Sequence, residues 1–152
     1  MNSFYRFFYH LTRLILGAVF IYASLDKILH PGAFAQAVFN YQVLPGQLVN
    51  LTALILPWVE LILGACLLSN RWMTGAAGLA AVLMTVFIGL ILFNLARGLN
   101  ISCGCFSTNP EEGPMDKLTL LRDALFLVLA FCLVGLTYYK KSNYHKNQLY
   151  TV

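Results

Sequence analysis

Two cysteines separated by one glycine carry the clearest chemistry in the sequence. Cys103-Gly104-Cys105 lies in the longest polar stretch, about residues 97–117. A disulfide between cysteines so close together closes a small, strained ring, and strain makes a disulfide easier to reduce. The glycine can adopt backbone angles that bring the two sulfurs together. Because a disulfide stabilises mainly by closing long loops, this ring is a poor structural staple. The pair predicts a thiol–disulfide oxidoreductase with Cys103 and Cys105 as its catalytic residues.

Two other interpretations of the same thiols stay open. Two thiolates and the imidazole of His30, which lies near the same membrane level, would suit a soft metal ion such as Cu(I) or Zn. A structural or incidental role is the other alternative. Cys66 and Cys132 differ, because they lie among apolar neighbours, where cysteine usually acts as a small hydrophobic residue.

The elements that position these cysteines follow from composition. Of the 152 residues, 59% are hydrophobic and only 11% are charged, against roughly 25% charged in soluble domains. Four apolar segments each reach the ~20 residues that cross a ~30 Å hydrocarbon core, at about residues 7–29, 48–68, 72–96 and 118–139. They do not alternate apolar and polar residues as barrel strands do. We therefore expect an all-α integral membrane protein, a single membrane domain over residues 1–152 forming an antiparallel bundle of four transmembrane helices.

The basic residues predict the orientation of this bundle. An even number of spans places both termini on one side, together with Arg6, Arg13, Arg71, Lys140, Lys141 and Lys146. Positive charge favours the cytoplasmic side, so we expect cytoplasmic termini in a multi-pass protein of the bacterial inner membrane. The outer loops, about 30–47 and 97–117, then face the periplasm, where disulfides are permitted. The basic residues flank apolar runs, so nucleic acid is not an expected partner.

The first outer loop contains two local signals. His30-Pro31-Gly32 should end the first span, because proline and glycine stop helices. The segment 34–41 is amphipathic enough for a short interfacial helix.

Charged residues inside a membrane are costly and are usually paired. Counted from the predicted span ends, Arg13 and Glu60 lie at similar depth, roughly 10–14 Å from the inner face at ~1.5 Å per residue. We therefore expect an Arg13–Glu60 ion pair. The alternative is that Arg13 extends to the inner surface while Glu60 is protonated or bonded to its own helix.

A second set of charges lies beneath the cysteine loop. Asp26 and Lys27 end the first span, and Arg122 and Asp123 open the fourth. Pairing of Asp26 with Arg122 and of Lys27 with Asp123 would lock the two helices together. The functional alternative is that Lys27 or Arg122 lowers a cysteine pKa, since a nearby cation favours the thiolate.

Aromatic residues on the same side could line an apolar pocket, which would offer a quinone site. They are Tyr22, Phe34, Tyr41 and Trp58. An interfacial aromatic belt is the competing explanation.

Several stretches together resemble one family. They are Phe20 to Ile28, Pro31 to Tyr41, Leu56 to Glu60 with Gly64, Ile101 to Phe106, and Leu121 to Asp123. The specific part is Cys-Gly-Cys-Phe followed by an Arg-Asp that opens the last span. The chain resembles the MauE-like branch of the DoxX superfamily of four-helix membrane proteins. It departs from that pattern at Ser107, where a glycine often follows the Cys-Gly-Cys-Phe run.

The resemblance implies a redox-associated membrane protein. Members of the family are linked to maturation of the disulfide-rich small subunit of methylamine dehydrogenase, beside a thioredoxin-like partner. Relatives in the superfamily are linked to quinone-coupled sulfur oxidation. The resemblance therefore implies disulfide exchange with a periplasmic thioredoxin-like protein and quinone as a candidate cofactor. The alternatives are soft-metal binding or transport, and a non-enzymatic membrane scaffold for a maturation partner.

Overall fold

Five helices make up the part of the chain that the structure, a computed structural model, describes, residues 3–98 and 117–149. They are α1 (Ser3–Leu29), α2 (Pro31–Asn40), α3 (Gly46–Ser69), α4 (Met73–Ala96) and α5 (Lys117–Leu149). Four helical segments are long and apolar enough to span a membrane: Ser3–Leu29, Gly46–Ser69, Met73–Ala96 and Leu118–Lys140. The prediction of an all-helical protein with four spans is confirmed.

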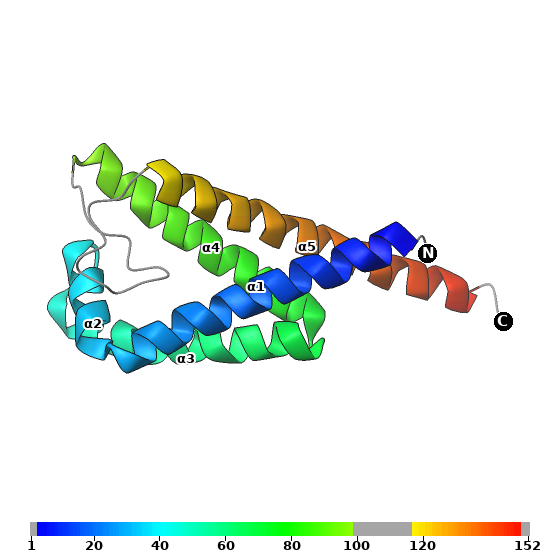
Figure 1. Ribbon diagram of the computed structural model, residues 1–152, viewed down its shortest axis with the longest axis horizontal. Helices are drawn as coiled ribbons and strands as arrows, with labels where there is room; N and C mark the ends of the chain where they lie inside the picture. Colours follow the sequence, from blue (N-terminus) through cyan, green and yellow to red (C-terminus); the bar gives the residue numbers. More distant parts are fainter. Residues whose placement is uncertain (1–2, 99–116, 150–152) are drawn as a thin grey trace.

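The four long helices pack as two antiparallel pairs. Helix α1 makes its main contacts with α3, and α4 makes its main contacts with α5. Figure 1 shows the two pairs side by side, with α1 beginning and α5 ending at one end of the molecule, here called the terminal end. Helix α2 lies at the opposite end, here called the α2 end. The cytoplasmic orientation of the terminal end stays a prediction.

Two glycines set the closest approach between α1 and α3. A Cβ atom added at Gly64 would lie 2.7 Å from Cγ1 of Ile21 and 3.0 Å from the carbonyl oxygen of Gly17. A Cβ at Gly17 would lie 2.8 Å from the Leu68 side chain. Small residues let helix backbones approach closely in membranes, where packing replaces the hydrophobic effect as the driving force. The contact also fixes the register of the two helices, with Gly64 level with the turn from Gly17 to Ile21.

Proline and asparagine shape the connections. Helix α1 ends at Leu29, as expected, but the following helix begins at Pro31 rather than at Phe34. Proline suits the first position of a helix, because its missing N–H would have no intrahelical acceptor there. At the terminal end, Asn70 closes α3 in a left-handed conformation, with φ 58°, which asparagine tolerates better than most residues. The chain therefore turns tightly between α3 and α4.

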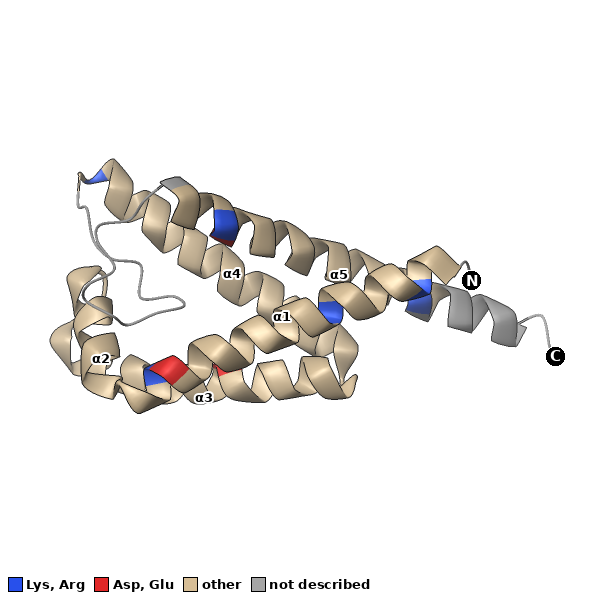
Figure 2. Cartoon of the chain, viewed as in Figure 1, with Lys and Arg blue, Asp and Glu red and all other residues tan. Residues whose placement is uncertain are grey.

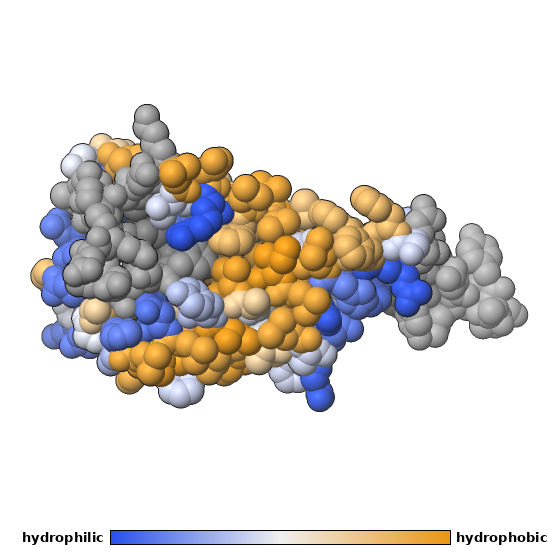
Figure 3. Space-filling model, in the orientation of Figure 1, coloured by the Kyte–Doolittle hydropathy of each residue, from blue (hydrophilic) through white to orange (hydrophobic). Residues whose placement is uncertain are grey.

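The outer surface of the spans is apolar. Figure 3 shows hydrophobic residues along the middle of the molecule and hydrophilic residues toward both ends. Each span contributes exposed large side chains to this surface, among them Leu14, Leu54, Val82 and Leu125. Such a surface is suited to lipid rather than water, since large apolar patches are rare on soluble monomers.

Candidate functional site

The central feature of the structure is a buried ion pair between α1 and α3. The ammonium nitrogen of Lys27 lies 2.7 Å and 2.8 Å from the two carboxylate oxygens of Glu60. The Lys27 side chain is 1% exposed and that of Glu60 is 2% exposed. Buried charges require a partner of this kind, because leaving either one alone in an apolar interior is very costly.

Two aromatic rings complete the surroundings of Lys27. Its Nζ lies 5.1 Å from the ring centre of Phe34 on α2 and 5.3 Å from that of Phe87 on α4. A cation within about 6 Å of a ring is attracted to the electron-rich face. Lys27 therefore joins four helices: its own, α3 through Glu60, α2 through Phe34 and α4 through Phe87.

The predicted Arg13–Glu60 pair is wrong. The contact of Gly17 with Gly64 places Glu60 one turn toward the α2 end and Arg13 one turn toward the terminal end. Along the helix axes, the Cα atoms of Arg13 and Glu60 are therefore offset by more than two turns, which is over ~10 Å at ~5.4 Å per turn. Helical side chains also tilt toward the N-terminus of their own helix. In these antiparallel helices Arg13 points away from Glu60, whereas Lys27 and Glu60 point toward each other.

Arg13 instead lies inside the bundle near the terminal end. It is 9% exposed, and its Nε atom is buried without a hydrogen-bond partner in the described part of the chain. Glu60 was expected to be protonated or bonded to its own helix if Arg13 did not pair with it. The structure instead gives Glu60 a partner in Lys27.

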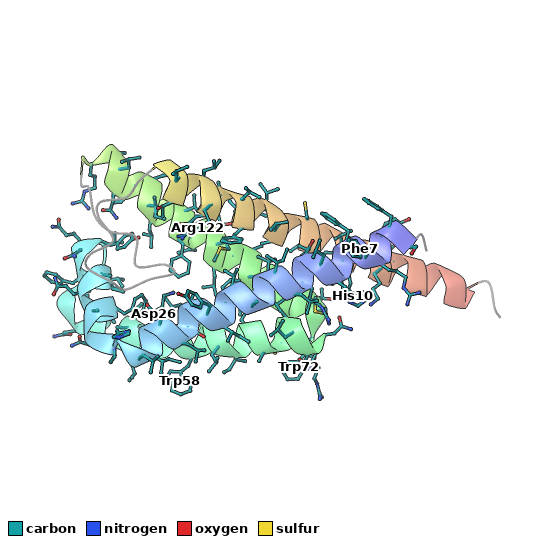
Figure 4. All side chains as sticks on the ribbon, in the orientation of Figure 1. Phe7, His10, Asp26, Trp58, Trp72 and Arg122 are labelled. Atoms are coloured by element: carbon teal, nitrogen blue, oxygen red, sulfur yellow. The ribbon has the colours of Figure 1, made fainter. Side chains whose placement is uncertain are left out.

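The predicted pairs between α1 and α5 are also wrong. Lys27 is paired with Glu60 rather than with Asp123. Asp26 has its carboxylate 3.6 Å from Nδ1 of His30, and Figure 4 shows Asp26 and Arg122 on different helix pairs. The structure gives no Asp26–Arg122 ion pair among the described residues. The cause is the packing of the helices. Because α1 packs mainly against α3, the inward-facing Lys27 meets Glu60 on α3.

Helix α5 has its own charged group near the α2 end. Arg122 Nε lies 3.2 Å from Oδ1 of Asp123, and Asp123 is 3% exposed while Arg122 is exposed. Burial, and then the negative charge of Asp123, raises the pKa of Tyr41 to about 12. Tyr41 thus carries a phenol that stays protonated beside a buried carboxylate.

Tyr41 is expected to resist ionisation at pH values where an ordinary tyrosine, with a pKa of 10.0, titrates. The pKa of Tyr41 is higher in the folded protein than in the unfolded chain. Ionisation of Tyr41 should therefore leave the stability of the protein unchanged below pH 10, and the stability should fall as the pH rises from 10 toward 12. Tyrosinate absorbance of the native protein and of Tyr41→Phe should therefore coincide around pH 10. A loss of absorbance in Tyr41→Phe at that pH would contradict the assignment.

One protein family matches most of this chain. The family model described as methylamine utilisation protein MauE matches residues 5–137, which is most of the chain. The chain belongs to the MauE family.

Curated relatives are identical to this MauE-family chain at about a third of the aligned positions. The methylamine utilization protein MauE of Paracoccus denitrificans is 34% identical over 80% of this chain and 65% of its own length. The protein of the same name from Methylophilus methylotrophus is 34% identical over 83% of this chain and 63% of its own. The protein of the same name from Methylorubrum extorquens is 35% identical over 75% of this chain and 61% of its own length. The chain thus spans less than two thirds of each relative's length. No solved structure matches it significantly.

The remaining expected residues of this MauE-family chain are not all brought together. Cys103 and Cys105 lie outside the described residues, so the thiol pair itself is untested. Cys66 is partly buried in α3 and Cys132 is exposed on α5, and both are free. The His30 side chain is 60% exposed beside Asp26. In the described ranges no group of three or more His, Cys, Asp or Glu residues could hold a metal ion.

The predicted aromatic pocket divides into two kinds of residue. Phe34 is buried against Lys27 and Tyr41 is half-buried, whereas Tyr22 is 68% exposed and Trp58 is 53% exposed. Because Tyr22 and Trp58 face outward, the four side chains do not close one pocket. The alternative, an aromatic belt at the membrane surface, stays a prediction, because Trp58 lies near the middle of α3.

Two residues inside the bundle escaped sequence reasoning: Phe87, which is partly buried, and Asn94, which is buried. Phe87 was one of many apolar residues in an uncharged span. Asn94 is 1% exposed, and its amide nitrogen donates to the Leu90 carbonyl at 3.0 Å while its Oδ1 has no hydrogen-bond partner among the described residues. An asparagine in such an apolar segment was itself a signal, because polar residues in spans usually face the protein interior.

Proposed function

We propose that this chain is a membrane accessory protein that exchanges disulfides through Cys103 and Cys105, supporting maturation of an exported protein. Its relatives are named as methylamine utilization proteins, and we place the chain in a process of that type. The observation that supports the proposal is the connection of the cysteines: their segment joins the end of α4 to the start of α5. Both anchoring helices belong to one packed pair.

The buried charges near the α2 end give this segment a rigid base. Lys27 ties α1, α2, α3 and α4 together, and Asp123 is buried in the second turn of α5. Functional loops work best on a scaffold that fixes both of their ends. The intramembrane charges therefore serve as a brace for the thiol segment rather than as catalysts.

The exchange step balances as ordinary thiol–disulfide chemistry. A thiolate of a thioredoxin-like partner attacks one sulfur of the Cys103–Cys105 disulfide and releases the other cysteine as a thiolate. The second partner thiolate then resolves the mixed disulfide. The partner dithiol is oxidised to a disulfide, and Cys103 and Cys105 become two thiols. Reoxidation of the pair by a quinone in the bilayer would transfer two electrons and two protons to give the quinol.

Serine variants test this proposal. Cys103→Ser and Cys105→Ser should each abolish turnover with a thioredoxin-fold protein used as the probe, because one thiol can form the mixed disulfide but cannot complete the exchange. Trapping the mixed disulfide on a gel and following the redox state of the probe measure the two steps. Cys66→Ser/Cys132→Ser is the matched control and should exchange normally.

Two outcomes would point elsewhere. An unchanged redox state of the probe in both loop variants would reject thiol exchange. Stoichiometric Cu(I) or Zn in the reduced protein, lost together in Cys103→Ser and His30→Ala, would instead support the soft-metal alternative. Full support of maturation by a variant that lacks both loop cysteines would favour the scaffold.

A further inference from the structure

A small recess lies at the terminal end, between α1 and α5. It has a volume of about 170 Å³ and is lined by Tyr5, Arg6, Tyr9, His10 and Lys140. Figure 2 shows basic residues of the two helices close together at this end. Residues from the start of α1 and from far along α5 therefore form one cationic surface that neither helix has alone.

No acidic residue is available to neutralise this surface. Positions 1–25, 61–110 and 124–152 contain neither Asp nor Glu, and these ranges include the start of α1, the turn between α3 and α4, and the end of α5. Farther along α1, buried Arg13 adds a guanidinium whose Nε has no hydrogen-bond partner among the described residues. The sequence thus offers this end no acidic side chain as a partner for its basic residues.

The walls of the recess are held in place. The Tyr9 hydroxyl donates to Oδ1 of Asn70 at 2.8 Å, and the Tyr5 hydroxyl donates to the Leu136 carbonyl oxygen. The Lys140 ammonium lies 4.8 Å from the centre of the Tyr9 ring. These contacts link α1 to α5 and to the α3–α4 turn, so the basic groups are presented on a fixed frame.

The recess also lies where the first apolar span begins and the fourth one ends, which is the level expected for lipid headgroups. Lys140 is the last residue of the fourth apolar span, and Arg6 is in the first turns of the first span. Tyrosines are enriched at this depth, where one end of the ring meets lipid and the other meets water. Basic pockets between transmembrane helices at the membrane surface bind anionic headgroups, and the guanidinium fork suits phosphate oxygens.

We propose that this recess binds a phosphate group, supplied by the headgroup of an anionic phospholipid of the adjoining leaflet. Arg6 and Lys140 contact the phosphate, and the aromatic walls pack against the upper part of the lipid. The proposal is independent of the thiol chemistry at the other end of the molecule, and either one can fail without the other.

Lipid retention by the full-length protein tests the proposal. The protein is extracted from vesicles of equal phosphatidylglycerol and phosphatidylcholine, and bound lipids are counted by native mass spectrometry. Arg6→Gln/Lys140→Gln should weaken phosphatidylglycerol binding by about 30-fold. A basic residue near an anionic surface contributes about fivefold in affinity, and this variant removes two such residues. Arg71→Gln is the matched control, since it removes an exposed basic residue of the same end outside the recess.

Three results would overturn the proposal. The first is equal retention of phosphatidylglycerol by the native protein and the double variant, and the second is an equal loss of phosphatidylglycerol in Arg71→Gln. The third is displacement of the lipid by millimolar inorganic phosphate alone, which would indicate a site for free anions. If the double glutamine variant does not fold, Arg6→Lys/Lys140→Arg should retain phosphatidylglycerol. In the native protein, salt should then release phosphatidylglycerol but not phosphatidylcholine, and an absence of this salt effect would also reject the proposal.

Discussion

Replacing Lys27 with methionine is expected to destabilise the protein by about 3–5 kcal/mol. The substitution removes the ammonium that lies 2.7 Å from Glu60 and leaves the carboxylate, 2% exposed, without its partner. It also removes the cation held between Phe34 and Phe87. Unfolding in mixed micelles, followed by helical circular dichroism, measures the loss.

The matched double variant separates the pair from the packing. Lys27→Met/Glu60→Leu should recover most of the lost stability, because apolar residues of similar volume often replace a buried ion pair at little cost. Arg97→Met removes an exposed cation and should change stability by no more than about 0.5 kcal/mol. If the double variant were as unstable as Lys27→Met, the buried charge would not be the cause.

Replacing Gly64 with alanine is expected to destabilise the protein by about 1–3 kcal/mol, the usual cost of overpacking. The new methyl group would lie 3.0 Å from the Gly17 carbonyl oxygen and 3.1 Å from the Ile21 backbone nitrogen. Backbone atoms cannot move aside as a flexible side chain can, so α1 and α3 would have to separate. Because this contact sets the helix register, Lys27 and Glu60 would also shift relative to each other.

Gly78→Ala provides the control with the opposite sign. Gly78 lies within α4, and a Cβ there meets nothing within 4 Å. Alanine is favoured over glycine inside a helix by about 1 kcal/mol, so this variant should be as stable as the native protein or more stable. The same unfolding measurement compares the two variants. Equal effects at Gly64 and Gly78 would show that helix propensity, not the α1–α3 contact, governs both.

Both predictions concern the contact between α1 and α3, which is part of the scaffold that holds the proposed thiol segment. A variant that weakens the α1–α3 pair should lower protein levels in the membrane before it alters disulfide exchange by the molecules that remain folded. A loss of exchange at normal protein levels and stability would contradict the bracing role proposed for the charges.

The sequence by itself determined the four spans, because their length and apolar composition leave few alternatives in a chain so poor in charge. It also placed the end of the first span at Leu29, where the following His30-Pro31-Gly32 favours a break in the helix. Cys103 and Cys105 were likewise found from spacing alone, and their chemistry remains a proposal.

Only the tertiary structure decided which charges meet. Depth counted from the predicted span ends put Arg13 and Glu60 at one level, whereas the packing of α1 on α3 sets them more than two turns apart. The Gly17–Gly64 contact sets the register of these two helices, and the opposite tilt of side chains in antiparallel helices directs Lys27 and Glu60 toward each other. The same packing brings Arg6 and Lys140, far apart in the chain, to one recess. Such contacts depend on which helices are neighbours, which the apolar pattern of each span does not encode.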